Sequence, residues 1–205
     1  MKKEKAKSNK NLQIRSKRKE QGMLNLLILF ILLIAFFSGA RRGFTMQIFY
    51  TIGYILSFFA AQYFYKSLAS HLELYIPYPA VTSNTQMAFF EQAFSFRLDE
   101  AFYAGVAFLL ILFAGGLITR FIGIFVHSLT YIPILRQVDW IAGGLLSVVL
   151  AYITIFLLLS LLSFVPVTAI QNQFSGHSLA RFIVEKTPFL TEQIQNLWIT
   201  NVIKS

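Results

Sequence analysis

Side chains that could do chemistry are few in this chain and lie far apart. The 205 residues include three histidines, His71, His127 and His177, and no cysteine. Zinc-type sites usually take paired ligands about three to five residues apart, and none of the histidines has such a neighbour. We therefore expect no metal site and no bound cofactor.

Motifs for covalent or phosphate chemistry are also missing from the sequence. It contains no G-x-S-x-G elbow, no Walker loop and no G-x-G-x-x-G fingerprint after a strand. Pumps and ion-coupled carriers place charged groups within the membrane, and the long apolar stretches of this chain hold none at their centres. We predict no catalytic residues and no enzyme activity.

Four long apolar stretches are the main feature of the sequence. They cover residues 23–39, 44–65, 101–119 and 140–165. A helix of about 20 apolar residues crosses a bilayer, and the composition is 56% hydrophobic with a mean hydropathy of +0.62. The runs lack the alternation of barrel strands. The sequence predicts an all-α integral membrane protein, with four transmembrane helices in residues 22–165.

Small and polar residues within these stretches suggest how the helices pack. Small residues four positions apart let membrane helices approach closely. Such rows are Gly53, Ser57 and Ala61; Gly115, Thr119 and Gly123; and Gly143, Ser147 and Ala151. Interhelical hydrogen bonds are expected from Asn25, Gln47, Thr51, Gln62, Thr154 and Ser160.

Charged residues flank the stretches. Asp139 precedes the fourth and can cap its free N–H groups, as Asp99 and Glu100 can for the third. Arg120 follows the third and can reach the headgroups. These acids are interpreted as caps.

Residues 1–21 form a basic tail that we expect to be disordered and cytoplasmic. The first 20 residues hold nine of the 18 Lys and Arg and carry a net charge of +7. Three roles are open to the tail: setting the topology, binding anionic headgroups, or binding nucleic acid. A role in topology is preferred. Nucleic acid is not expected as a partner, because no aromatic residues accompany the charges.

The positive-inside rule places both termini in the cytoplasm, with 14 of the 18 basic residues on that side. Arg41 and Arg42 conflict with it, because they occupy the short turn after the first stretch. A re-entrant hairpin would resolve the conflict. Cleavage of a signal peptide after Ala40 is a further alternative, which would leave three spans.

Two other segments have amphipathic patterns. Residues 85–98 place Met87, Phe90, Phe94 and Leu98 on one helical face, which predicts an interfacial helix in the loop between the second and third stretches. Residues 166–205 contain further amphipathic pieces around Pro188. We expect this C-terminal segment to lie on the surface.

Two short motifs resemble the colicin V production protein family of bacterial inner-membrane proteins. They are residues 38–44, with the sequence SGARRGF, and residues 138–144, with the sequence VDWIAGG. The resemblance implies four spans and marks Arg42, Gly43, Asp139 and Gly143 as structural motif residues. Asn25 and Ser147 depart from the residues that the family often has there.

The resemblance also implies a role in toxin or peptide production or secretion and in envelope homeostasis, through membrane protein partners that the sequence does not identify. The alternative is an oligomeric channel or passive transporter, in which the small-residue faces join protomers around a polar pore. A homo-oligomer is compatible with both.

Overall fold

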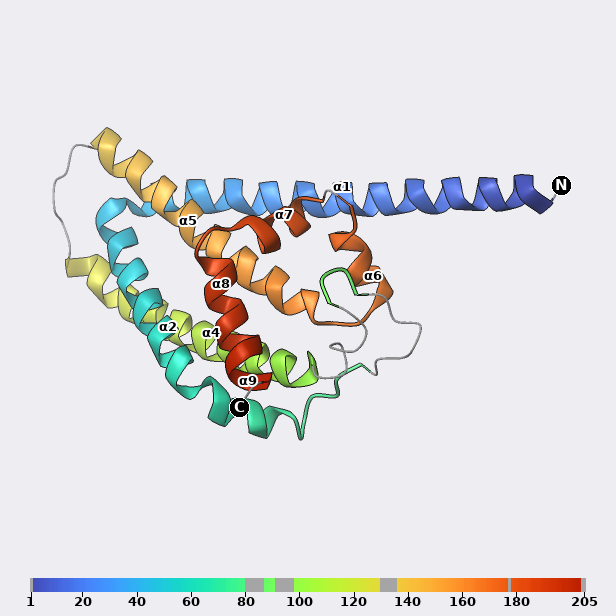
Figure 1. The fold of residues 1–205 in the computed structure, drawn as a ribbon. Helices are drawn as coiled ribbons and strands as arrows, with labels where there is room; N and C mark the ends of the chain where they lie inside the picture. Colours follow the sequence, from blue (N-terminus) through green and yellow to red (C-terminus); the bar gives the residue numbers. More distant parts are fainter. Residues whose placement is uncertain (1, 80–86, 91–97, 130–135, 177, 204–205) are drawn as a thin grey trace.

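Four long helices make up most of the computed structural model, which describes residues 2–79, 87–90, 98–129, 136–176 and 178–203 (Figure 1). They are α1 (Lys2–Arg42), α2 (Phe44–Leu72), α4 (Leu98–Leu129) and α5 (Arg136–Ser163). No strand occurs in these described ranges, which confirms the all-α prediction.

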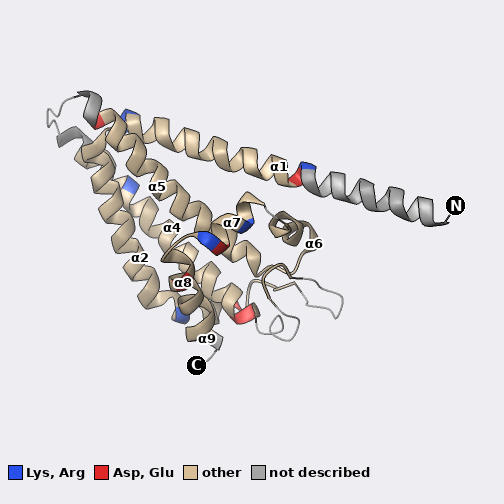
Figure 2. Ribbon diagram, turned by 45° about the horizontal axis from the view of Figure 1, so that its top comes forward, with Lys and Arg blue, Asp and Glu red and all other residues tan. Residues whose placement is uncertain are grey.

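Each long helix contains a segment long and apolar enough to cross a membrane. The segments are Lys19–Arg42, Phe44–Leu72, Leu98–Val126 and Asp139–Ser163. The predicted stretches lie inside these helices, except that the fourth was extended to residue 165 and α5 ends at Ser163. Figure 2 shows few charged residues along the membrane-spanning segments of these helices.

The basic tail differs from its prediction as a disordered arm. Helix α1 begins at Lys2 and continues without interruption into the first span. Helix formation is limited by its first turn, and an existing helix extends more easily. The tail is rich in Lys, Glu, Gln and Arg, which are good helix formers, so it prolongs the helix that the span begins.

The long helices pack most extensively as two pairs, α1 with α5 and α2 with α4. In Figure 1, α2 crosses α4 and α5 lies against the membrane-spanning part of α1. Contacts between α2 and α5 join the pairs. The side chains that point away from the bundle are largely apolar, as expected for a surface that faces lipid.

After α5 the chain folds into short helices. These are α6 (Thr168–Gln171), η1 (Asn172–Phe174), α7 (Leu179–Lys186), α8 (Leu190–Gln195), η2 (Asn196–Thr200) and α9 (Asn201–Ile203). Their amphipathic pattern agrees with the sequence. They cover one end of the bundle, and some of their apolar side chains also enter its core.

Trp198 shows how far the C-terminal segment reaches into the bundle. Its side chain is fully buried, and its ring lies 5.7 Å from that of Phe108 and 6.1 Å from that of Phe164. Ile183 and Ile194 are buried in the same core. The apolar faces of the short helices therefore pack against protein rather than against headgroups.

Two glutamines hold this C-terminal layer in place. Gln21 of α1 donates from Nε2 to the carbonyls of Asn172 and Ser175, at 2.9 and 2.8 Å. Gln171 donates to the carbonyls of Ser163 and Val165. The layer is thus tied both to the first span and to the end of the fourth.

The predicted interfacial helix at residues 85–98 falls mostly outside the described residues. The part that the structure describes, residues 87–90, is a bend that packs against the core. The N–H of Ala88 donates to Oε1 of Gln171 at 2.9 Å. Leu98 already belongs to α4 and is fully buried.

Candidate functional site

Gly43 alone separates the first two long helices. Its φ of 81° and ψ of 164° lie in a region that is open essentially only to glycine. The Gly43 N–H donates to the carbonyl of Gly39, and the Gly43 carbonyl accepts from the N–H of Gln47. The chain therefore changes direction at one residue while hydrogen bonds continue on both sides of it.

Asp139 closes this turn from a distant part of the sequence. Its Oδ1 accepts a hydrogen bond from the backbone N–H of Phe44 at 2.8 Å. Phe44 is the first residue of α2, and Gly43 before it has no side chain to serve as a cap. The carboxylate satisfies a free N–H group and meets the positive end of that helix dipole.

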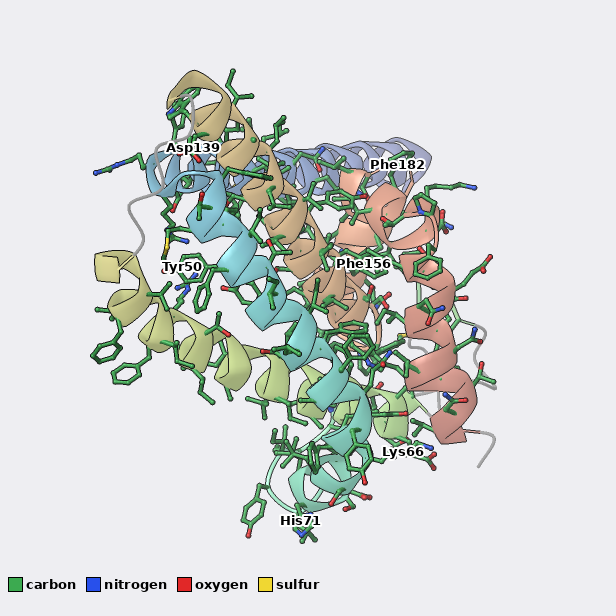
Figure 3. All side chains as sticks on the ribbon, turned by 90° about the vertical axis from the view of Figure 1, so that its left-hand side faces the viewer. Tyr50, Lys66, His71, Asp139, Phe156 and Phe182 are labelled. Carbon is green, nitrogen blue, oxygen red and sulfur yellow. The ribbon has the colours of Figure 1, made fainter. Side chains whose placement is uncertain are left out.

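This contact corrects the prediction that Asp139 caps the N-terminus of its own helix. Helix α5 begins at Arg136, so Asp139 lies within its first turn rather than before it. From there its side chain reaches α2, and Figure 3 shows Asp139 where α1, α2 and α5 meet. Asp139 therefore caps α2 and not its own helix.

Gly143, one turn further along α5, lets the backbones meet. A Cβ atom added to Gly143 would lie 2.8 Å from the carbonyl carbon of Gly43 and 2.9 Å from the oxygen of Gly39. A Cβ on Gly39 would overlap the side chain of Ser147. Glycine at both positions therefore allows α1 and α5 to approach to backbone contact.

Arg42 lies apart from this network. Its guanidinium is over the ring of Tyr50, 5.1 Å from the centroid, and the side chain is exposed. A cation over an aromatic face is stabilised by the ring quadrupole. Of the four motif residues, the structure brings Gly43, Asp139 and Gly143 together, and it places Arg42 beside Tyr50 at the edge.

The small-residue row of α2 faces α4. A Cβ on Gly53 would overlap Thr119, and one on Gly115 would overlap Ser57. Ala61 is fully buried in the core. Gly123 departs from the pattern, because it faces the ring of Tyr50.

The row of α5 faces α1 through Gly143 and Ser147. Ala151, the last member of this row, is half-buried. Small-residue rows were predicted in the three longer spans only. The row of α5 packs against a fourth helix, α1, at Gly39 and Gly43. Their four-residue spacing is the signal that the sequence analysis missed.

Hydroxyls in the spans bond within their own helices. Thr51 donates to the carbonyl of Gln47 at 2.7 Å, and Thr154 donates to that of Leu150 at 2.9 Å. The prediction of interhelical bonds is wrong for these two threonines. Bonds to the preceding turn are a common alternative for Ser and Thr in a helix. Asn25 Oδ1 and Gln47 Oε1 are buried without a partner in the described part of the chain.

One of the three histidine side chains is described by the structure. His71 Nδ1 contacts the carbonyl of Ser67 at 2.7 Å, while the side chains of His127 and His177 lie outside the described residues. The described residues contain no group of three or more His, Cys, Asp and Glu that could hold a metal ion.

Tyr78 joins the loop after α2 to the end of α5. Its hydroxyl donates to the carbonyl of Phe164 at 2.7 Å. Burial of the phenol, followed by the charge of Asp99 and by Tyr103, raises the pKa of Tyr78 to about 12. The phenol is therefore a neutral donor that holds the loop against the core.

The fold and the motif define a polytopic α-helical membrane protein whose spans are locked at one end by a carboxylate and close glycine contacts. Residues 24–188 match the family described as Colicin V production protein, and the chain belongs to that family. This confirms the resemblance seen in the two motifs.

A relative in Bacillus subtilis (strain 168) has the name uncharacterized transmembrane protein YshB. It is 34% identical over 176 residues, which cover 86% of this chain and 97% of the relative. No solved structure matches the chain.

Proposed function

We propose that this protein is a non-enzymatic accessory protein of the bacterial inner membrane, which acts through partner proteins in peptide toxin production or secretion and in envelope homeostasis. The family description supports the first part of this role. The observation that supports an accessory role is that the motif residues are already engaged in contacts within the protein. The Asp139 carboxylate is bound to the backbone of α2 and takes the space beside Gly43, and neighbouring backbone takes the space beside Gly143.

Helix α1 offers the surface for partners. It packs on α5 along one side, and the other side exposes a row with alternating spacings of three and four residues: Met23, Leu26, Phe30, Leu33 and Phe37, each more than half exposed. This is the a and d spacing of a helix that pairs with another helix. With the termini in the cytoplasm, the basic residues that directly precede the first span would meet anionic headgroups and fix the depth of this row in the membrane.

Site-specific crosslinking tests the partner role. The natural chain has no cysteine, so single-cysteine variants need no other substitution. We expect Leu26→Cys to crosslink to other membrane proteins in native membranes. The control is Phe59→Cys, which is 61% exposed on α2, outside this row. Equal products from both variants would overturn the assignment of α1 as the partner surface.

A deletion strain tests the secretory role. In a host that makes a secreted peptide toxin, loss of the protein should lower the toxin in the medium while its intracellular synthesis continues. Expression of the protein from a plasmid should restore secretion. Unchanged secretion in the deletion strain would contradict the proposal.

We rank the channel alternative second. It needs the small-residue rows between protomers, and Gly53, Gly115 and Gly143 are already in contact within one protomer. The purified protein reconstituted in lipid should therefore show no discrete conductance. A discrete oligomer that conducts would favour the channel over the accessory role.

A further inference from the structure

A groove with a volume of about 460 Å³ opens between α4 and α5. Its walls are apolar and include Leu109, Phe113 and Leu117 of α4 and Leu158 and Leu161 of α5. Phe113, Leu117 and Leu158 are about half exposed or more, so the groove is open to the surroundings of the bundle. In a membrane those surroundings are lipid.

The pairing of the helices explains why this space is not filled. Helix α4 is held against α2 at Gly53 and Gly115, and α5 is held against α1 at Gly143. Gly116, which lies in the groove wall, faces Tyr54 of α2 rather than α5. The two pairs consequently diverge, and Figure 3 shows α4 and α5 separating toward the end that carries Asp139.

Arg120 is the single charged residue in the groove lining. Its side chain is exposed, and it makes no ion pair or hydrogen bond with any residue that the structure describes. The carboxylate of Asp139, in the first turn of α5, is bound to the N–H of Phe44 and is not part of the groove lining. A cation at the end of an apolar groove, without a protein partner, is complementary to an amphiphile with an anionic head.

The dimensions fit one acyl chain. From Val106 to Arg120 the lining follows α4 for about 21 Å, at about 1.5 Å per residue. One leaflet supplies about 15 Å of a hydrocarbon core about 30 Å thick.

We propose that the groove binds one anionic phospholipid, with an acyl chain along α4 and α5 and the phosphate on Arg120. This site is separate from the partner surface on α1.

Native mass spectrometry of the full chain tests the proposal. The protein in mild detergent is mixed with dioleoylphosphatidylglycerol or with dioleoylphosphatidylcholine. We expect one tightly bound phosphatidylglycerol and weaker retention of phosphatidylcholine. Arg120→Gln should lower phosphatidylglycerol retention by about tenfold, because a charge-assisted bond to the phosphate is lost. Arg41→Gln, which removes an exposed arginine outside this groove, should retain the lipid.

A second pair of variants tests the groove itself and keeps every charge. Leu158→Trp fills the cavity and should displace the lipid, whereas Leu145→Trp, at a position 58% exposed on the same helix, should not. Size-exclusion elution and thermal unfolding verify that each variant is folded. Retention in Arg120→Gln and Leu158→Trp equal to that in their controls would overturn the site. Equal retention of both lipids by the natural chain would overturn its selectivity for anionic heads.

Discussion

The hydrogen bond between Asp139 and Phe44 gives a quantitative prediction for Asp139→Ala. Loss of a capping side chain costs about 1 kcal/mol, and a buried N–H left without a partner costs about 1–3 kcal/mol. The Phe44 N–H is partly buried, and its 2.8 Å bond is to a charged acceptor. We expect Asp139→Ala to lower the free energy of unfolding by about 2 kcal/mol.

Thermal unfolding in a mild detergent measures this effect. For a chain of this size, about 2 kcal/mol corresponds to a fall in Tm of about 4–8 °C. Asp139→Asn should keep most of the stability, because asparagine is also a good capping residue and retains an oxygen acceptor. Its remaining loss reports the interaction of the charge with the helix dipole, about 0.3–1 kcal/mol.

Asp99→Ala is the matched control. Asp99 is also a carboxylate in the first turn of a span, but it accepts no hydrogen bond from another long helix in the described part of the chain. Its removal should lower the free energy of unfolding only by the dipole contribution, about 0.3–1 kcal/mol, and Tm by correspondingly less. Equal falls in Tm for Asp139→Ala and Asp99→Ala would refute the interhelical cap.

Three further outcomes follow from the same structure. Gly43→Ala should lower the free energy of unfolding by about 2–3 kcal/mol through backbone strain. The double variant with Asp139→Ala should lose less than the sum of the two single losses, because the added Cβ would overlap the Asp139 carboxylate. Additive losses would contradict this coupling. Gly143→Ala should lower Tm, because backbone atoms lie 2.8–3.0 Å from its added Cβ. Gly22→Ala should raise Tm, since nothing lies within 4 Å of its added Cβ and alanine favours a helix. A Tm change of the same sign in both variants would contradict the role of close packing at Gly143. The folded pKa of Tyr78 is raised from 10.0 to about 12, so its contribution to stability is complete below pH 10.0 and falls as pH rises toward 12. A shift of two pKa units corresponds to about 2.7 kcal/mol, and solvent screening of this half-buried ring reduces the expected loss of stability to about 1 kcal/mol. Unfolding measured as a function of pH should detect this loss, and Tyr78→Phe should abolish it.

The spans could be predicted from the sequence because their length and composition are local properties. A bilayer of fixed thickness demands about 20 apolar residues, and that requirement needs no knowledge of tertiary contacts. The rows of small residues were visible for the same reason. Their partners were not, since Gly53 meets Thr119 and Gly143 meets Gly39 across long stretches of sequence.

The differences between prediction and structure arise where one pattern allows two environments. Asp139 before an apolar run reads as a local cap, and its acceptor role toward Phe44, 95 residues away, depends on how α5 meets α2. The face containing Ile194 and Trp198 is equally suited to a headgroup layer and to a protein core. Hydrophobicity does not distinguish lipid from protein, so only the packed structure decides.

The deep burial of Trp198 imposes an order on biogenesis. Synthesis runs from the N-terminus, so all four spans are made and can enter the membrane before this residue exists. Until then the rings of Phe108 and Phe164 lack their neighbour, and the end of the bundle that α8 and η2 cover is open. Maturation therefore ends with a step in which the newly completed C-terminal helices close one end of the inserted bundle. A chain halted before Trp198 would be inserted but unfinished, with exposed aromatic surface for chaperones or membrane proteases to recognise.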